Sequence, residues 1–119
     1  MDETHQGNFI EKKITLKSNR VFLLKFIEFY NGCFVSLSED LCKLGGIHVS
    51  IASNNRTQSA KVIPNIRDPI FMKTLSEKIS LMINGIVITN FNNKNPLSLN
   101  EMQELMNEVL KLMETKTSD

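Results

Sequence analysis

Residues 20–37 constrain the fold most strongly, because this stretch is apolar on both sides when it is read as a strand. It reads RVFLLKFIEFYNGCFVSL. Alternate residues of a strand point to opposite faces of a sheet. In the first arm, one parity carries Val21, Leu23, Lys25, Ile27 and Phe29, and the other carries Phe22, Leu24, Phe26, Glu28 and Tyr30. A strand with one solvated face is apolar on one parity only, so both faces of this strand need cover.

Short strands make up most of the first half of the chain. Asn31-Gly32 predicts a hairpin turn, since both residues tolerate positive φ. The return strand is expected over residues 33–38, with Cys33, Val35 and Leu37 on one face. Three more strands are expected at 9–17, 47–52 and 59–63. In the strand at 47–52, the apolar set Ile47, Val49 and Ile51 alternates with a polar, solvent-facing set, His48, Ser50 and Ala52.

Helical spacing takes over after residue 67. Asp68-Pro69 supplies an N-cap carboxylate and a proline at the first helical position, and Asn84-Gly85 supplies the stop. A strand is expected over 86–91. Ser98 and Glu101 form a capping box for the last helix, and Leu97 and Met102 occupy the positions of a hydrophobic staple.

The order of elements indicates an α+β fold, β-β-β-β-β-α-β-α. We expect a six-stranded, mostly antiparallel sheet with both helices packed on one face, since no β-α-β alternation runs through the chain. The length of 119 residues indicates one domain. Residues 9–114 are expected to form it, with a flexible tail at 1–8 and a frayed tail at 115–119.

Composition narrows the classes of partner and the cellular compartment that we expect for this protein. A formal net charge of +1 gives no field that would favour nucleic acid or an anionic membrane. The N-terminus has no signal-peptide pattern, and no apolar run is long enough to cross a bilayer. Two cysteines make a disulfide framework improbable. We therefore expect a cytoplasmic protein, in the nucleus as well, with neither nucleic acid nor membrane as a partner.

The sequence offers little for catalysis. His48 and Cys42 could form a metal site or a nucleophile–base pair in a small enzyme or ligand sensor, but too few other ligands exist. Glu39 and Asp40 are adjacent carboxylates beside a strand end, where solvation is the ordinary state. We expect no enzyme activity, no cofactor and no metal.

The two-faced strand points to a protein partner. Two helices can cover one face of the sheet, and the other would expose apolar residues that monomers rarely expose. We take Phe22, Leu24, Phe26 and Tyr30 as the candidate dimer interface; the opposite parity, Val21, Leu23, Ile27 and Phe29, stays open. A polar loop is the second candidate contact, and its residues are Ser53, Asn54, Asn55, Arg56, Thr57 and Gln58.

Residues 18–37 resemble the hairpin of the proteasome assembly chaperone 3 family. In that family an apolar strand leads through a glycine, here Gly32, into a strand that ends in Val-Ser-Leu, here residues 35–37. Lys-Val-Ile at 61–63, the Asp68-Pro69 helix start and the final strand and helix follow the same order. The resemblance spans roughly residues 10–114 and extends to the sister family, proteasome assembly chaperone 4.

The resemblance implies a non-catalytic assembly chaperone. Family members dimerise through their sheets, with a sister chaperone or as a homodimer in isolation. The dimer binds α-subunits of the 20S proteasome and promotes correct α-ring formation. By similarity, the loop around Asn54, Asn55 and Arg56 would contact an α-subunit. The alternative is a small dimeric scaffold of the longin or roadblock type in a trafficking or signalling complex, which would place a helix after the first hairpin.

Overall fold

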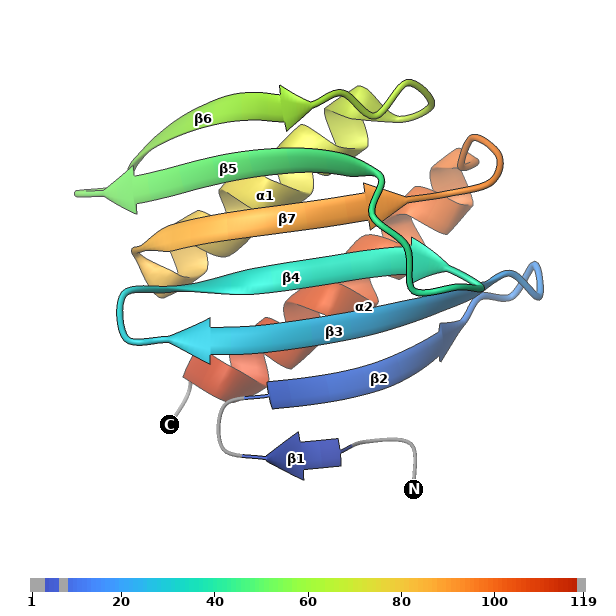
Figure 1. Cartoon of the computed structure of the whole chain (residues 1–119), viewed down its shortest axis with the longest axis horizontal. Coiled ribbons are helices and arrows are strands. Elements are labelled where there is room, and N and C mark those ends of the chain that lie inside the picture. Colours follow the sequence, from blue (N-terminus) through green and yellow to red (C-terminus); the bar gives the residue numbers. More distant parts are fainter. Residues whose placement is uncertain (1–3, 7–8, 118–119) are drawn as a thin grey trace.

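One sheet and two helices form the described part of the chain (Figure 1). The structure is a computed structural model that describes residues 4–6 and 9–117, with side chains described for residues 9–114. The elements are β1 (Thr4–Gln6), β2 (Phe9–Thr15), β3 (Val21–Phe29), β4 (Gly32–Glu39), β5 (Gly46–Ser53), β6 (Arg56–Ile63), α1 (Pro69–Ile83), β7 (Ile86–Asn92) and α2 (Leu99–Thr117). From β2 onward this is the predicted order, so the α+β prediction is confirmed.

The sheet is mixed, with a single parallel pair. Its strand order is β1-β2-β3-β4-β7-β5-β6, so β7 is inserted between β4 and β5. β7 runs parallel to β4, and every other neighbouring pair is antiparallel. The insertion joins the two antiparallel halves of the sheet, β1–β4 and β5–β6, into one surface.

Both ends of the chain differ from the sequence-based expectation. Thr4–Gln6 pairs with β2 as a seventh strand, although residues 1–8 were expected to be a loose tail. α2 continues through Thr117, into the segment 115–119 that was expected to fray. Residues 1–3, 7–8, 118 and 119 lie outside the described part of the chain.

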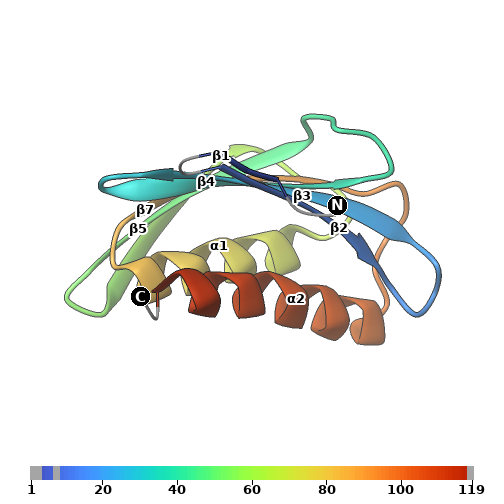
Figure 2. The same ribbon diagram turned by 90° about the horizontal axis from the view of Figure 1, so that it is seen from below.

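The two helices cover one face of the sheet, as expected (Figure 2). The helix-facing side chains of the strands and the inner stripes of the helices form one apolar core. In β3 and β4, the residues of this core are Phe22, Leu24, Phe26, Cys33, Val35 and Leu37. Burial also raises the pKa of the Cys33 thiol to about 12, helped by the nearby Glu28 carboxylate, so this cysteine is an inert core residue.

Local signals fix the ends of the helices. Ser98 and Glu101 form the capping box: the Ser98 amide donates to Glu101 Oε1 at 2.8 Å, and the Glu101 amide donates to Ser98 Oγ at 3.1 Å. Asn84 ends α1 in the left-handed region with φ of 51°. Asp68 stands at the N-cap position of α1, but its carboxylate makes no cap hydrogen bond. It accepts instead from Asn93 Nδ2 at 2.7 Å and from the Leu97 amide at 3.0 Å, which ties α1 to the entry of α2.

The β3–β4 and β5–β6 hairpin turns have different physical causes. Phe29 pairs with Gly32, so Tyr30 and Asn31 form the first turn, and neither has positive φ, contrary to expectation. Gly32 is needed for another reason: a Cβ there would lie 2.1 Å from the Ile86 carbonyl oxygen. The β5–β6 turn is left-handed at both central residues, with φ of 54° at Asn54 and 64° at Asn55, a backbone that suits the right-handed twist of the strands.

A charged cluster closes the opposite end of the sheet. Arg20 makes a bidentate pair with the buried Glu39 carboxylate, at 2.7 and 3.0 Å. Its remaining donors reach Glu101 Oε1 and the carbonyl oxygens of Asn95 and Pro96. Because the Arg20 guanidinium binds it, the pKa of Glu39 is lowered. Glu39 therefore has a structural role, joining β4 to Arg20 and to the loop before α2.

Candidate protein interface

The face of the sheet that points away from the helices carries a continuous apolar row. Residues directly opposite each other in neighbouring strands share a face. Following the register from β2 to β6 gives Phe9, Ile27, Phe34, Ile88, Val49 and Ala60. We call these six residues the outer row. Neither helix covers it, because both helices lie on the other face (Figure 2).

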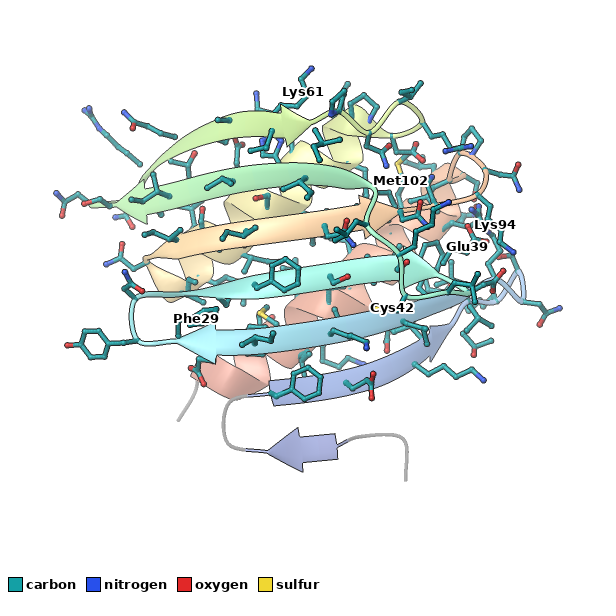
Figure 3. The ribbon with its side chains drawn as sticks, viewed as in Figure 1. Phe29, Glu39, Cys42, Lys61, Lys94 and Met102 are labelled. Carbon is teal, nitrogen blue, oxygen red and sulfur yellow. The ribbon has the colours of Figure 1, made fainter. Side chains whose placement is uncertain are left out.

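A second, shorter apolar set flanks the outer row at the hairpin end. Phe29, Ile86 and Ile51 each lie two residues from an outer-row residue of the same strand, and therefore on the same face. Phe29 is 56% exposed, Ile51 43% and Ile88 39%. Phe29 projects from the end of β3 (Figure 3). Together the two sets make an apolar surface across six strands, the feature that a sheet-to-sheet partner would bury.

The other half of this face mixes polar and apolar residues, and the chain itself covers part of it. The loop of residues 40–45 rises on the side opposite the helices (Figure 2). Asn90 holds it in place: its Oδ1 accepts from the Gly45 amide at 2.7 Å, and its Nδ2 donates to the Lys43 carbonyl at 2.9 Å. Ser38 Oγ accepts from the Lys43 amide at 3.0 Å. The loop therefore bounds the apolar surface on one side.

One ion pair lies beside the outer row. Lys25 Nζ is 3.0 Å from Glu11 Oε2, and the two residues are opposite each other in β2 and β3. The hydrogen bond with Glu11 raises the pKa of Lys25. Because the pair neutralises itself, it does not give the face a net charge of its own.

The structure contradicts most of the predicted interface set. Phe22, Leu24 and Phe26 are buried beneath the helices and belong to the core, so they cannot contact a partner. Tyr30 is fully exposed, but in the turn and not on the face. The open alternative parity, Val21, Leu23, Ile27 and Phe29, is the one that faces outward. Sequence could not decide between them, because both parities of β3 are apolar.

β5 shows the same reversal. His48, Ser50 and Ala52 were expected to face solvent, yet all three are buried on the helix side. The apolar set of the strand, Ile47, Val49 and Ile51, faces outward. Ser50 is satisfied there by a 2.8 Å hydrogen bond to Ser76 of α1. The apolar side of β5 therefore faces away from both helices.

The predicted contact loop is shorter than expected. Only Asn54 and Asn55 form the turn, while Ser53 ends β5 and Arg56, Thr57 and Gln58 begin β6. Ser53, Asn54, Asn55, Arg56 and Gln58 are exposed, and Thr57 is partly buried. The segment is exposed, but as a two-residue turn between paired strands rather than as a six-residue loop.

The alternative chemical site does not form. His48 is buried on the helix side, whereas Cys42 lies in the exposed loop near Lys25 on the opposite face (Figure 3). Within residues 4–6 and 9–117, no group of three or more metal-ligating side chains comes together. Among the same residues, neither helix combines the length and apolarity that crossing a membrane requires. The outer face is therefore the feature that most needs a functional explanation.

Comparison with known proteins shows a likeness of fold to solved structures. No protein-family model matches the chain, and no curated protein matches it. Among solved structures, the chain is similar to one in the "Crystal Structure of a Novel Chaperone Complex for Yeast 20S Proteasome Assembly". The TM-score is 0.68 with 11% identity, and the match covers 98% of this chain and 99% of the other. At that identity the likeness establishes a shared fold over the whole chain.

Proposed function

We propose that this protein is a non-catalytic chaperone of 20S proteasome assembly that works as a dimer. It binds proteasome α-subunits and promotes correct α-ring formation, in the cytoplasm and the nucleus. The observation that carries the dimer is the outer row with its flank, an apolar surface that the chain leaves uncovered. The fold shared with a chain of a yeast proteasome assembly chaperone complex supports the chaperone role.

The geometry favours a partner sheet laid face to face. Two packed sheets lie about 10 Å apart and interdigitate the side chains of their inner faces. The outer row offers such side chains in register from β2 to β6. The loop of residues 40–45 stands at one side of the row and would set the position of the partner sheet. The partner is a sister chaperone of the same fold or a second copy of this chain.

The contact with an α-subunit is proposed at the β5–β6 hairpin tip. Asn54, Asn55 and Arg56 are exposed at the β5–β6 turn and offer polar groups with one positive charge. A partner sheet on the outer row would leave this tip free, so dimerisation and α-subunit binding can occur together.

The dimer is tested by a matched pair of charge substitutions. Ile88→Asp places a carboxylate in the outer row, and Leu81→Asp does so on α1 at nearly the same exposure, 45% against 39%. Burial of an unpaired charge in a packed interface costs several kcal/mol. We expect sedimentation velocity to show a dimer for the parent and for Leu81→Asp, and a folded monomer for Ile88→Asp. A parent protein that stays monomeric at micromolar concentration, alone and with a sister chaperone, would refute the dimer.

The chaperone role is tested by affinity capture of the tagged protein from its native cells. Enrichment of α-subunits and a small sister protein, without mature β-subunits, is the expected result. Arg56→Ala should reduce α-subunit recovery while the dimer persists. Recovery of trafficking or GTPase-regulating complexes would favour the scaffold alternative. The structure gives that alternative no support, because residues 40–45 between β4 and β5 contain no helix.

A further inference from the structure

A groove of about 750 Å³ lies between α1 and α2, on the face of the molecule opposite the outer row. Figure 2 shows the two helices side by side beneath the sheet, beginning at the same end. Ile70 and Phe71 line the groove from α1, and Met102 and Met106 line it from α2. Met102 lies near the start of α2 (Figure 3). We call this feature the helix groove, and its volume is within the range of ligand pockets.

The walls of the helix groove are apolar and open to solvent. Ile70 is 79% exposed, although it stands in the first turn of α1. Leu81 lies about three turns further along α1 on the same side and is also exposed. Met102 and Met106 pack against the core but remain partly exposed towards the groove. Methionine adapts its shape to a partner, and exposed apolar surface of this kind is typical of an interaction site.

The exposed charges beside the groove are positive. Arg67 lines its entrance, and Lys78 lies one turn beyond Thr74, which lines the α1 wall. Both charged side chains are exposed, and neither has an ion-pair partner among the residues that the structure describes. Asp68 lines the same end, but its carboxylate is buried and accepts hydrogen bonds from the loop before α2. Arg67 and Lys78 are therefore free to pair with acidic groups of a ligand.

The acidic residues of α2 lie on the other side of that helix. The first three contact groups in or beside β2, in the pairs Glu101–Arg20, Glu104–Lys17 and Glu108–Lys12. Glu114 lies with Lys17 and Glu108 around a hollow on that same side. Towards the groove, α2 offers only the uncharged amides of Gln103 and Asn107 beside its methionines.

The carboxylate of α1 also points away from the groove. Glu77 accepts a 2.6 Å hydrogen bond from Ser59 of β6, on the side of α1 that faces the sheet edge. The exposed charge around the groove is thus one-sided, with Arg67 and Lys78 on the α1 wall and no acidic side chain of α1 or α2 turned towards them among the described residues.

The backbone of the walls favours a helix as the occupant. Both walls are helices, whose backbone groups are hydrogen-bonded within the helix, so neither wall offers a strand edge to an extended peptide. A helix satisfies its own backbone and presents only side chains to the groove. An apolar stripe with anchors at i, i+3 or i+4, and i+7 is the pattern that such a groove receives.

We propose that the helix groove binds an amphipathic helix of a partner protein, with an apolar stripe flanked by Asp or Glu. The stripe packs against Ile70, Met102 and Met106, and the acidic flank faces Arg67 and Lys78. Because the groove lies opposite the outer row, this helix binds whether or not a second sheet covers that row. The inference therefore does not rest on the proposed dimer.

NMR of isotope-labelled methionine methyl groups in the purified full-length protein tests the proposal. The probe is a synthetic helical peptide of about 18 residues with a leucine stripe and flanking glutamates. It should shift the signals of Met102 and Met106 until they saturate, and leave Met113, which is fully buried in the core, unchanged. The same peptide with lysines in place of the glutamates should bind at least about tenfold more weakly.

Matched substitutions separate the groove from the rest of the surface. Ile70→Asp should weaken binding of the glutamate peptide at least about tenfold. Ile88→Asp, the same change at an exposed isoleucine of the outer row, should leave it unaltered. Removal of both groove charges, Arg67→Gln/Lys78→Gln, should weaken binding about fivefold. The control with the same loss of charge is Lys61→Gln/Lys73→Gln, on β6 and the β6 side of α1, and should bind like the parent.

Three results would overturn the proposal. The glutamate peptide fails to shift Met102 and Met106, the glutamate and lysine peptides bind equally, or the two double variants weaken binding alike. Shifts of Met102 and Met106 that grow with protein concentration in the absence of peptide would assign the groove to a second copy of this chain, and would overturn it too. None of these results bears on the outer row, so the proposed dimer stands or falls separately.

Discussion

Neighbouring residues of one hairpin meet opposite conditions on the two sides of the sheet. Phe26 and Val35 lie opposite each other in register and are buried under the helices. One position along, Ile27 and Phe34 are also opposite each other, but on the face that neither helix covers. The apolar content of the two sides is similar here. What separates them is the position of α1 and α2.

In the other half of the sheet the contrast is sharper. The helix side of β5 carries His48, Ser50 and Ala52, whereas its outer side carries Ile47, Val49 and Ile51. Hydrophobicity alone would assign the core to the wrong face of β5. On β5 the outer face is more apolar than the face that packs against the helices, which is the pattern that burial against a partner would stabilise.

The largest difference in stability is expected between two truncations at neighbouring positions of β3, one on each face. Phe26→Ala should lower the free energy of unfolding by about 3–5 kcal/mol, because it opens a cavity in the core. Ile27→Ala should cost less than about 1 kcal/mol in the monomer, since its side chain is already partly solvated. Urea unfolding at a protein concentration too low for assembly measures both values. Equal losses would mean that both faces of β3 are core.

Local sequence predicts the parts of this fold that depend on near neighbours. The capping box at Ser98 and Glu101 and the stop at Asn84 involve residues within a few positions of each other. The outward parity of β3 and β5 was not predictable, because it depends on where two distant helices pack. The same is true of the covered half of the outer face, where Asn90 of β7 holds residues 43 and 45. The outer row could not be predicted from sequence either, because it depends on the register of β7 with β4 and β5. Those strands are far apart in the sequence.

A second test compares the ion pairs of the two sides. Arg20 on the helix side satisfies the buried Glu39, while Lys25 and Glu11 are partly solvated on the outer face. Arg20→Lys should cost about 2–3 kcal/mol, because a lysine cannot reproduce the bidentate fork or reach both loop carbonyls. Lys25→Gln should cost less than about 1 kcal/mol. The urea midpoints of the two variants measure this difference. A larger loss of stability for Lys25→Gln than for Arg20→Lys would contradict the prediction.

Acid should affect the helix side more than the outer side. The pKa of Glu39 is lowered in the folded state, chiefly by the Arg20 guanidinium. Its stabilisation is therefore present above the unfolded-state pKa of about 4.3 and is lost as the pH falls through the lower folded value. Glu39→Gln should be less stable than the parent at pH 7, and the difference should shrink below about pH 4, by about 1.4 kcal/mol per unit of pKa shift. Urea titrations of the parent and of Glu39→Gln from pH 7 to 3 test this, and a difference that stays constant down to pH 3 would contradict it.

The smallest change in stability is expected for Ile88→Thr. This substitution tests whether the outer row contributes to dimer formation and not to folding. Ile88→Thr keeps the β-branched shape on the outer face and should alter monomer stability by no more than about 0.5 kcal/mol. Val87→Thr, one residue away and fully buried, places a hydroxyl in the core and should cost about 1–3 kcal/mol. Sedimentation at graded concentrations should show the reverse order for dimer affinity, with Ile88→Thr the weaker dimer. If Ile88→Thr leaves both stability and affinity unchanged, the outer row is not the surface that the partner buries.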